Sequence, residues 1–286
     1  MSKLTKYPVG GSIYDAVVKM TAGLEIDYDV NLNEVIGAGG QGDVFQAERK
    51  DDRLKVAIKV VERAKLTRSQ GIQPLELVTL SRVQDVPGVV KLLDSRYVGE
   101  GNLALIMERL RGPDLFDFII ERESALSEDM AHCLFKQTLN IVMECYKLGI
   151  VHRDIKDENL VFDDTDHLKL IDFGCATFID HTVNGKFTSF AGTLAVAPPE
   201  WFTRHEYQPE SYTVWQLGCL LFDMLCGDVP FKSNEEVVSA NVPWTRDVSK
   251  PCWSLVENCL KKSPAERPSL MQIAGDVWTR QAALHD

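Results

Sequence analysis

The chain has 286 residues, enough for one two-lobed domain or two small domains with a hydrophobic core. Hydrophobic residues make up 45% and charged residues 26%, a balance that argues against a disordered chain. The formal net charge is −11, and an acidic surface repels phosphate backbones and anionic lipid, so we expect no nucleic acid and no membrane as partner, and basic proteins or peptides instead.

The first predicted element is a short amphipathic helix within an N-terminal extension, residues 1–28. Ser12 is expected to cap it, and Gly23 to end it. Its apolar residues follow helical spacing: Ile13, Ala16, Val17 and Met20. This apolar face must pack against another surface. Packing on the chain's own domain is a simpler expectation than packing on a partner protein.

Residues 29–107 have mostly the pattern of strands. Apolar and β-branched runs predict strands at 30–36, 44–48, 55–61 and 103–107, and a polar turn at 49–52. Pro74 marks the start of a helix that carries Glu76.

After residue 113 the pattern changes to helices. Ser127 is expected to cap a long helix that Gly149 ends. The run 214–226 is apolar nearly all round, which predicts a helix buried in the centre of this part. The sequence therefore predicts an α+β, bilobal fold, with a small β-rich N-lobe (29–107), a hinge (108–113) and a larger helical C-lobe (114–286).

A glycine-rich loop with the pattern G-x-G-x-x-G-x-V follows the first predicted strand. It consists of Gly37, Ala38, Gly39, Gly40, Gln41, Gly42, Asp43 and Val44. Glycines let backbone N–H groups close over phosphate oxygens without a Cβ in the way. The loop alone also fits a dinucleotide-binding turn, with Glu62 as the acid for the ribose. That alternative requires a helix after Gly42, and the polar turn at 49–52 leaves too few residues for one.

Lys59 ends the sequence Val-Ala-Ile-Lys in the predicted strand 55–61. A lysine that faces inward from a strand needs anionic partners, and we expect Glu76 and a phosphate. Taken alone, this motif would equally describe a lysine that points into water.

Two motifs in the second half carry the strongest signal, HRDIKDEN at 152–159 and Asp-Phe-Gly at 172–174. Phosphoryl transfer needs magnesium on the phosphates, a cation on the transferred group and a carboxylate that accepts the hydroxyl proton. Asp154 fits the carboxylate as catalytic base, and Lys156 fits the cation. Asn159 and Asp172 supply the hard oxygen ligands that Mg²⁺ prefers, so ATP and Mg²⁺ are the predicted cofactors.

From about Tyr28 onward the chain resembles the eukaryotic protein kinases, and more narrowly the Pim kinases of the calmodulin-dependent-kinase-like group. The matching stretches are 114–119, 152–159, 168–174, 198–201 and 226–231. Lys156 after Asp154, and Thr193 ahead of Pro-Pro-Glu at 198–200, resemble the serine/threonine pattern. The resemblance implies transfer of the γ-phosphate of ATP to serine or threonine, with Thr193 among the catalytic residues.

The resemblance also implies an adenine pocket lined by apolar residues. These are Ile36, Val44 and Ala57 above the ring, Val161 below it, Met107 at the back, and Ile171 before Asp172. The hinge is one residue shorter than in Pim kinases and carries Leu110 in place of a proline that removes an N–H. We therefore expect the Glu108 carbonyl and the Leu110 amide to bind adenine.

Five acidic residues match positions that receive substrate arginines in Pim kinases: Asp114, Asp117, Glu158, Asp223 and Asp228. They predict a preference for Arg or Lys upstream of the phosphorylated Ser or Thr. An ordinary solvated acidic surface is the alternative for each residue alone.

The activation segment departs from the Pim pattern. Residues 186–193 contain no acid, and Ser189 and Ala191 stand where Pim kinases carry acids before the Gly-Thr pair. One hypothesis is that a phosphate on Thr188 or Ser189 binds Arg153 and switches the enzyme on. The alternative is an enzyme that is active without it.

Two further departures leave alternatives of function open. Gln41 replaces the usual aromatic at the tip of the glycine loop, and Thr213 replaces an aspartate, which Pim kinases also lack. An ATP-binding pseudokinase or a scaffold of the same fold is the alternative. All five residues whose loss marks a pseudokinase are present: Lys59, Glu76, Asp154, Asn159 and Asp172.

Seven scattered cysteines, without a C-x-x-C pair, predict neither a disulfide framework nor a zinc site. Buried, reduced thiols in a cytoplasmic or nuclear protein are the simpler interpretation.

The first six residues lack the apolar run of a leader, and the longest apolar stretch, 217–231, is interrupted by two aspartates. We expect a monomer.

Overall fold

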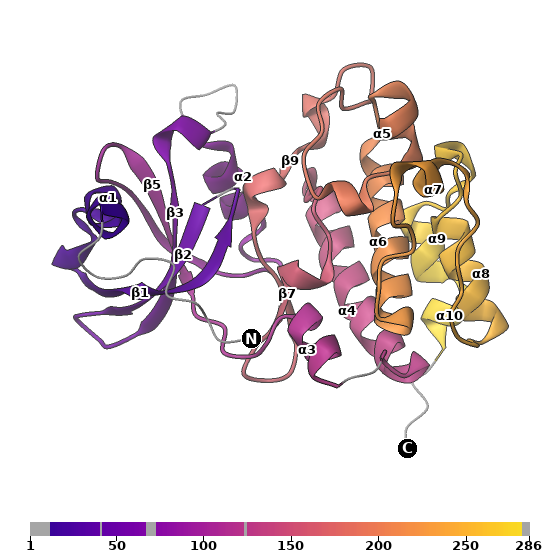
Figure 1. The fold of residues 1–286 in the computed structure, drawn as a ribbon, viewed down its shortest axis with the longest axis horizontal. Helices are drawn as coiled ribbons and strands as arrows, with labels where there is room; N and C mark the ends of the chain where they lie inside the picture. The colour runs from indigo at the N-terminus through magenta and orange to yellow at the C-terminus, as the bar shows by residue number, and fades with distance from the viewer. Residues whose placement is uncertain (1–11, 41, 67–72, 123–124, 282–286) are drawn as a thin grey trace. The chain divides into compact units, whose positions relative to one another are not determined.

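The computed structural model describes residues 12–40, 42–66, 73–122 and 125–281 (Figure 1). They form two compact units. The first comprises the residues up to 85 together with 90–111, and the second comprises 86–89 and the residues from 112 onward. Within the described ranges, no helix has the length and apolar character needed to cross a bilayer.

The first unit is built on a five-stranded antiparallel sheet with the order β1-β2-β3-β5-β4. Its strands are β1 (Tyr28–Gly39), β2 (Gly42–Arg49), β3 (Lys55–Val61), β4 (Leu92–Val98) and β5 (Asn102–Glu108). The four predicted strands are confirmed, β3 with the predicted bounds and the other three with slightly wider ones. β4 was not predicted, because this edge strand carries Asp94, Ser95 and Arg96 in place of an apolar run.

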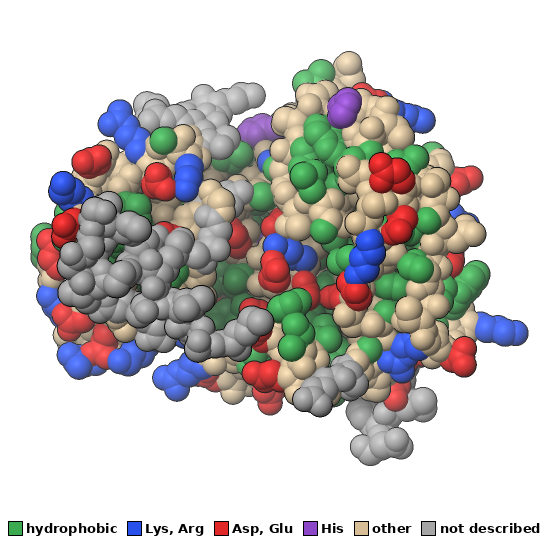
Figure 2. All heavy atoms as spheres, in the orientation of Figure 1, with side chains coloured by type: hydrophobic (Ala, Val, Ile, Leu, Met, Phe, Trp, Pro, Cys, Tyr) green, Lys and Arg blue, Asp and Glu red, His purple; other side chains and the backbone are tan. Residues whose placement is uncertain are grey.

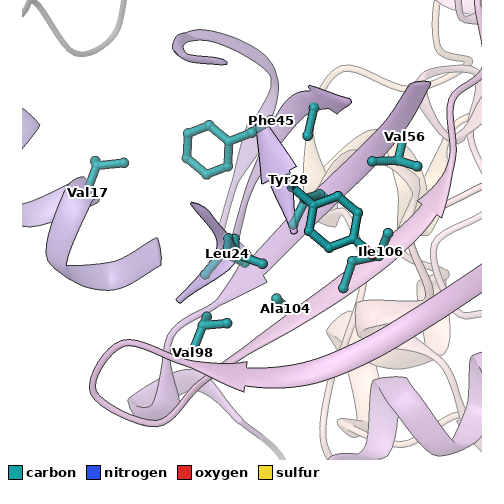
Figure 3. Close-up of a cluster of buried hydrophobic side chains, with 11 residues drawn as sticks. Val17, Leu24, Tyr28, Phe45, Val56, Val98, Ala104 and Ile106 are labelled. Atoms are coloured by element: carbon teal, nitrogen blue, oxygen red, sulfur yellow. The ribbon is translucent and has the colours of Figure 1, made fainter. Parts of the chain in front are cut away.

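One face of this sheet is covered by the N-terminal segment, α1 (Ser12–Thr21) and the 3₁₀ turn η1 (Leu24–Ile26). Ser12 is the first residue of the helix and not a cap ahead of it. Val17 and Leu24 pack into the cluster around Phe45 on the sheet (Figure 3). Burying one such side chain contributes about 1.5–3 kcal/mol. Val17 and Met20 of the predicted apolar face therefore pack on the chain's own unit, while the side chains of Ile13 and Ala16 lie outside the described part.

The other face carries α2 (Leu75–Val83), and the 3₁₀ turn η2 (Arg63–Lys65) follows β3. Side chains alternate along a strand, so Ile58 faces the N-terminal segment while Lys59 and Val61 face the other way. Leu77 of α2 packs against the cluster that Val61 forms with Leu103 and Leu105. The alternation thus turns Lys59 toward α2.

The second unit is mainly helical. Its helices are α3 (Leu115–Glu121), α4 (Glu128–Lys147), α5 (Pro199–Arg204), α6 (Pro209–Cys226), α7 (Asn234–Ser239), α8 (Lys250–Cys259), α9 (Leu270–Gly275) and α10 (Val277–Arg280). Two small antiparallel pairs complete it: β6 (Ile150–Val151) with β9 (Thr177–Phe178), and β7 (Leu160–Phe162) with β8 (Leu168–Leu170). Short 3₁₀ turns follow several of these elements: η3 (Asp157–Asn159), η4 (Phe173–Cys175), η5 (Ile179–His181), η6 (Leu194–Val196) and η7 (Pro264–Glu266).

The two longest helices of this unit follow the predicted patterns. Ser127 caps α4 by accepting a hydrogen bond from the N–H of Met130 at 3.3 Å. α6 lies in the middle of the helices (Figure 1) and is buried over nearly its whole length. It begins at Pro209, earlier than the predicted 214, because its buried first turns contain Tyr212 and Thr213 and so lack an uninterrupted apolar run.

A buried ion pair joins α5 to the segment before α9. Arg267 makes two bonds to the carboxylate of Glu200, at 2.7 and 2.8 Å. The same guanidinium donates to the carbonyl oxygens of Ser211 and Lys261. All its donor nitrogens are thus engaged, which marks this pair as a structural anchor.

All seven cysteines are free thiols. Most are buried as expected, but Cys133 is exposed. Burial raises the pKa of Cys145 and of Cys259 to about 12, so these thiols stay protonated and unreactive.

Candidate active site

The glycine-rich loop is the tip of the β1–β2 hairpin. Gly37 pairs with Val44, and Gly39 with Gly42, across the turn at Gly40. Gln41 lies outside the described residues. Gly42 has a φ of +143°, and a Cβ there would overlap the carbonyl of Val60. Because β2 follows Gly42, the helix that a dinucleotide-binding turn requires is absent from this position.

Lys59 of β3 and Glu76 of α2 form a buried ion pair, with 2.5 Å between Nζ and Oε1. The two residues are only 3% and 9% exposed. A buried ammonium is costly unless a carboxylate accompanies it, so the pair fixes both side chains. The inward orientation expected for Lys59 is what the structure shows.

Four of the predicted adenine-side residues of the first unit lie on four adjacent strands of the sheet: Ile36 on β1, Val44 on β2, Ala57 on β3 and Met107 on β5. Val44 pairs with Lys59, and Ala57 with Met107. Ala57, Met107 and Leu110 are buried, whereas Ile36 and Val44 are partly exposed. β5 ends at Glu108, whose N–H donates to the Lys91 carbonyl at 3.0 Å.

In the second unit, the carboxylate of Asp154 is held by two other segments. The N–H of Thr193 donates to Oδ1 at 2.8 Å, and Nδ2 of Asn159 donates to Oδ2 at 3.0 Å. The same amide nitrogen also donates to the Asp154 carbonyl at 2.8 Å. The carboxylate is therefore fixed in one orientation, and the predicted residues Asp154, Asn159 and Thr193 are brought together.

The β7–β8 hairpin brings Asn159 next to Asp172. Asn159 precedes β7, and its carbonyl accepts a hydrogen bond from Ile171 N–H at 3.0 Å. His152 supports this turn, with Nε2 3.0 Å from the Ile171 carbonyl oxygen and its ring edge-on to Phe173. Val161, predicted below the adenine, is part of the same hairpin.

Asp172 has a left-handed backbone, with φ 58°, and its Oδ1 accepts a hydrogen bond from Gly174 N–H at 3.1 Å. A non-glycine residue in this region is uncommon and often marks a functional site. The amide nitrogen of Asn159 is used on Asp154, which leaves its oxygen to serve as a ligand. An amide oxygen beside a carboxylate fits Mg²⁺, which takes few protein ligands and completes its shell with water and phosphate.

The described residues contain no group of three or more His, Cys, Asp or Glu side chains that could hold a metal.

Lys156 forms an ion pair with Glu158 and is partly buried. Burial opposes its charge, but the hydrogen bond to Glu158 and the charge of Asp154 outweigh it, so the pKa of Lys156 is raised. Lys156 therefore remains a cation.

The five predicted groove acids lie on three segments of the second unit. Asp114 caps α3 and accepts from Asp117 N–H at 2.7 Å, Glu158 belongs to η3, and Asp223 belongs to α6, ahead of Asp228. Asp157 connects these acids. The sequence analysis did not assign this residue to the groove. It is hydrogen-bonded to Asp223 and interacts electrostatically with Asp114. Its only sequence signal was its place beside Glu158.

Burial decides the protonation of this groove. It raises the pKa of Asp223 to about 8, with the nearby Asp157 as the second cause, and it also raises the pKa of Asp157 and Asp114. Asp228 differs, because its ion pair with Lys232 lowers its pKa.

Figure 2 shows acidic and basic side chains interspersed on the face that it draws, without a large area of one sign.

The chain is similar to known proteins over most of its length. Residues 30–279 match the protein kinase domain. A zebrafish serine/threonine-protein kinase pim-2 is 36% identical over 268 residues, 88% of this chain and 85% of that protein. A Caenorhabditis elegans serine/threonine-protein kinase prk-2 is 37% identical over 262 residues, 88% of this chain and 58% of that protein. A human SNF-related serine/threonine-protein kinase is 32% identical over 271 residues, 90% of this chain and 35% of that protein.

Proposed function

The chain belongs to the protein kinase family and is a Pim-like serine/threonine protein kinase, and from this premise we propose which of its residues carry the reaction. Asp154 is the catalytic base. The observation that carries this assignment is its carboxylate, held between Asn159 and Thr193 by hydrogen bonds of 3.0 and 2.8 Å. A base fixed in this way meets the substrate hydroxyl without first having to be ordered.

The remaining charged groups bind or neutralise the negative charge of the phosphates. Lys59, oriented by Glu76, binds phosphate oxygens of ATP, and Lys156 neutralises the transferred phosphoryl group. Asn159 and Asp172 hold Mg²⁺, which when bound neutralises the phosphates. The N–H groups of the β1–β2 hairpin bind phosphate, and the residues near Ala57 and Met107 bind adenine.

The proposed substrates are proteins with Arg or Lys upstream of the phosphorylated Ser or Thr. Support comes from the groove acids, of which Asp114, Asp157 and Asp223 have raised pKa values because burial and like charges work against their ionisation. A guanidinium bound beside them would offset both costs and favour the ionised form.

The test of this site is the Asp154→Asn variant, which keeps the shape of the side chain and removes the base. We expect kcat to fall on the order of 10²–10⁴-fold, the usual contribution of general base catalysis, and the melting temperature to fall only slightly, because the asparagine keeps one of the two acceptor oxygens. Asp166→Asn is the matched control, because Asp166 is exposed in the β7–β8 turn and should tolerate asparagine with full activity. Near-normal phosphate transfer by Asp154→Asn would show that another group is the base.

A further inference from the structure

Arg153 is buried and already has protein partners. Its Nε donates to the Cys175 carbonyl at 2.7 Å, and its guanidinium lies 5.1 Å from the ring centroid of Phe187. The residue is only 9% exposed. A guanidinium within about 6 Å of an aromatic ring centroid is attracted by the negative face of the ring. Arg153, which one hypothesis pairs with a phosphate on Thr188 or Ser189, thus contacts an aromatic residue of the activation segment.

Phe187 is itself fixed on both sides. Its N–H donates to the Tyr207 carbonyl at 2.8 Å, and the N–H of Tyr207 donates back to the Phe187 carbonyl at 3.1 Å. The neighbouring Lys186 forms an ion pair with Glu206. This bridge holds the backbone of Phe187 in place, and its side chain is buried, with 4% of the residue exposed.

An aromatic cluster extends this anchorage along the segment. Its members are Phe187, Phe190, Trp201, Tyr207 and Tyr212. Phe190 packs on Trp201 with 5.2 Å between ring centroids, and Tyr207 Oη donates to the Ser189 carbonyl at 3.1 Å. The side chains of Thr188 and Ser189, between these anchors, are exposed.

The far end of the segment rests on the catalytic loop. Gly192 has a φ of +116°, and a Cβ there would overlap the Arg153 carbonyl. Tyr212 Oη donates to the same carbonyl at 3.1 Å, and Thr193 N–H donates to the Asp154 carboxylate. The position of Arg153 is therefore coupled to the proposed base.

We propose that Phe187 is a positioning residue that holds Arg153, and through it the catalytic loop, so that the activation segment needs no phosphate. The ring takes the place that the acids or phosphates of other kinases take, and it costs less desolvation than a buried anion would. This inference rests on the proposed role of Asp154 in phosphate transfer.

The experiment uses phosphatase-treated protein whose mass confirms that no phosphate remains. Transfer to a serine peptide is measured for the wild type, Phe187→Leu, Phe187→Tyr, Ser189→Asp and the double variant Phe187→Leu/Ser189→Asp. Amide hydrogen exchange of residues 186–193 is measured on the same samples, because it reports the order of the segment independently of activity.

We expect the dephosphorylated wild type to keep its kcat and its protected amides. Phe187→Leu should lower kcat about three- to thirtyfold, the range of a partly desolvated cation–π contact, with little change in KM for ATP or peptide. Phe187→Tyr keeps the ring and should keep the rate. Ser189→Asp should restore most of the rate in the Phe187→Leu variant and change the wild type little.

Two results would overturn the inference. One is a large loss of kcat and protection when the wild type is dephosphorylated, and the other is a Phe187→Leu variant with wild-type rate and protection. If Phe187→Leu does not fold, pentafluorophenylalanine at position 187 keeps the shape and weakens the ring's negative face, and an unchanged kcat would then exclude the contact. A wild type that transfers no phosphate would contradict the proposed function, while hydrogen exchange would still decide the inference.

Discussion

Asp154 and Asp223 are carboxylates of the same unit in opposite situations. Asp154 receives N–H donors from two other segments, whereas Asp223 is half-buried in α6 beside Asp157, and its pKa rises to about 8. The first group is arranged for its task before any substrate arrives. The ionised form of Asp223 is disfavoured, and a substrate cation would stabilise it. In the proposed function, the preorganised donors serve the chemistry and the unbalanced acids serve substrate recognition.

The same chain contains a carboxylate that arginine has already neutralised. Glu200 is only 4% exposed, whereas Asp223 is half-buried, but two hydrogen bonds from Arg267 accompany Glu200. This pair is the internal reference for the groove, because it shows how a buried acid is stabilised once a guanidinium is present.

The largest effect is expected from breaking that reference pair. Arg267→Met leaves Glu200 buried and unpaired, and should lower the free energy of unfolding by about 3–5 kcal/mol. Urea unfolding measures this change. The double variant Glu200→Met/Arg267→Met should recover much of the loss, and equal instability of the single and double variants would contradict the ion-pair explanation.

The next effect concerns the buried Lys59–Glu76 pair, to which the proposed function assigns a part in the reaction. Lys59→Met should lower kcat on the order of 10²–10³-fold, because a cation directed at phosphate is lost, and it should also lower the free energy of unfolding, because Glu76 stays buried without this partner. Lys55→Met is the matched control, since Lys55 is exposed at the start of the same strand. Similar rates for the two variants would remove Lys59 from the site.

A third prediction tests the groove through pH. The pKa of Asp223 is raised on folding, so between pH of about 4 and 8 the unfolded chain has lost a proton that the folded chain keeps, and stability falls as pH rises. Asp223→Asn removes this titration. At pH 8 the variant should be more stable by on the order of 1–2 kcal/mol, with a smaller gain at pH 5.

Urea midpoints from pH 5 to 9 measure this difference. Asp228→Asn is the control, because Asp228 is exposed and its ion pair with Lys232 lowers its pKa. A constant difference between Asp223→Asn and the wild type at all pH values would mean that Asp223 is ionised throughout.

The smallest effect is expected from an exposed groove acid. Glu158→Ala should raise KM for an arginine-containing peptide by about two- to fivefold, the size of an exposed charge contact, and leave KM for ATP unchanged. Raised salt should reduce the difference, since exposed pairs are screened. A KM that responds neither to the substitution nor to salt would exclude Glu158 from peptide binding.

How much the sequence predicted depends on the range of the interactions. The glycine hairpin, the Lys59–Glu76 pair and the catalytic loop lie in motifs whose spacing specifies them locally. The edge strand β4 was missed because its polar residues lack an apolar pattern. The bounds predicted for the extension, the hinge and the lobes stay predictions.

Contacts between distant segments were harder to predict. Asp157 meets Asp223, and Phe187 meets Arg153, only because the folded unit brings them together. One sequence carries no record of such pairs. The sequence therefore predicted which residues meet around Asp154, while the coupling of the activation segment to them was not predicted.

The most direct measurement is phosphorylation of a positional peptide library by the purified, dephosphorylated protein with ATP and Mg²⁺. We predict label on serine and threonine, with Arg or Lys preferred upstream of the labelled residue and the preference weakened in Glu158→Ala. Labelling that favours acidic or proline-containing peptides, or no labelling at all, would contradict this account.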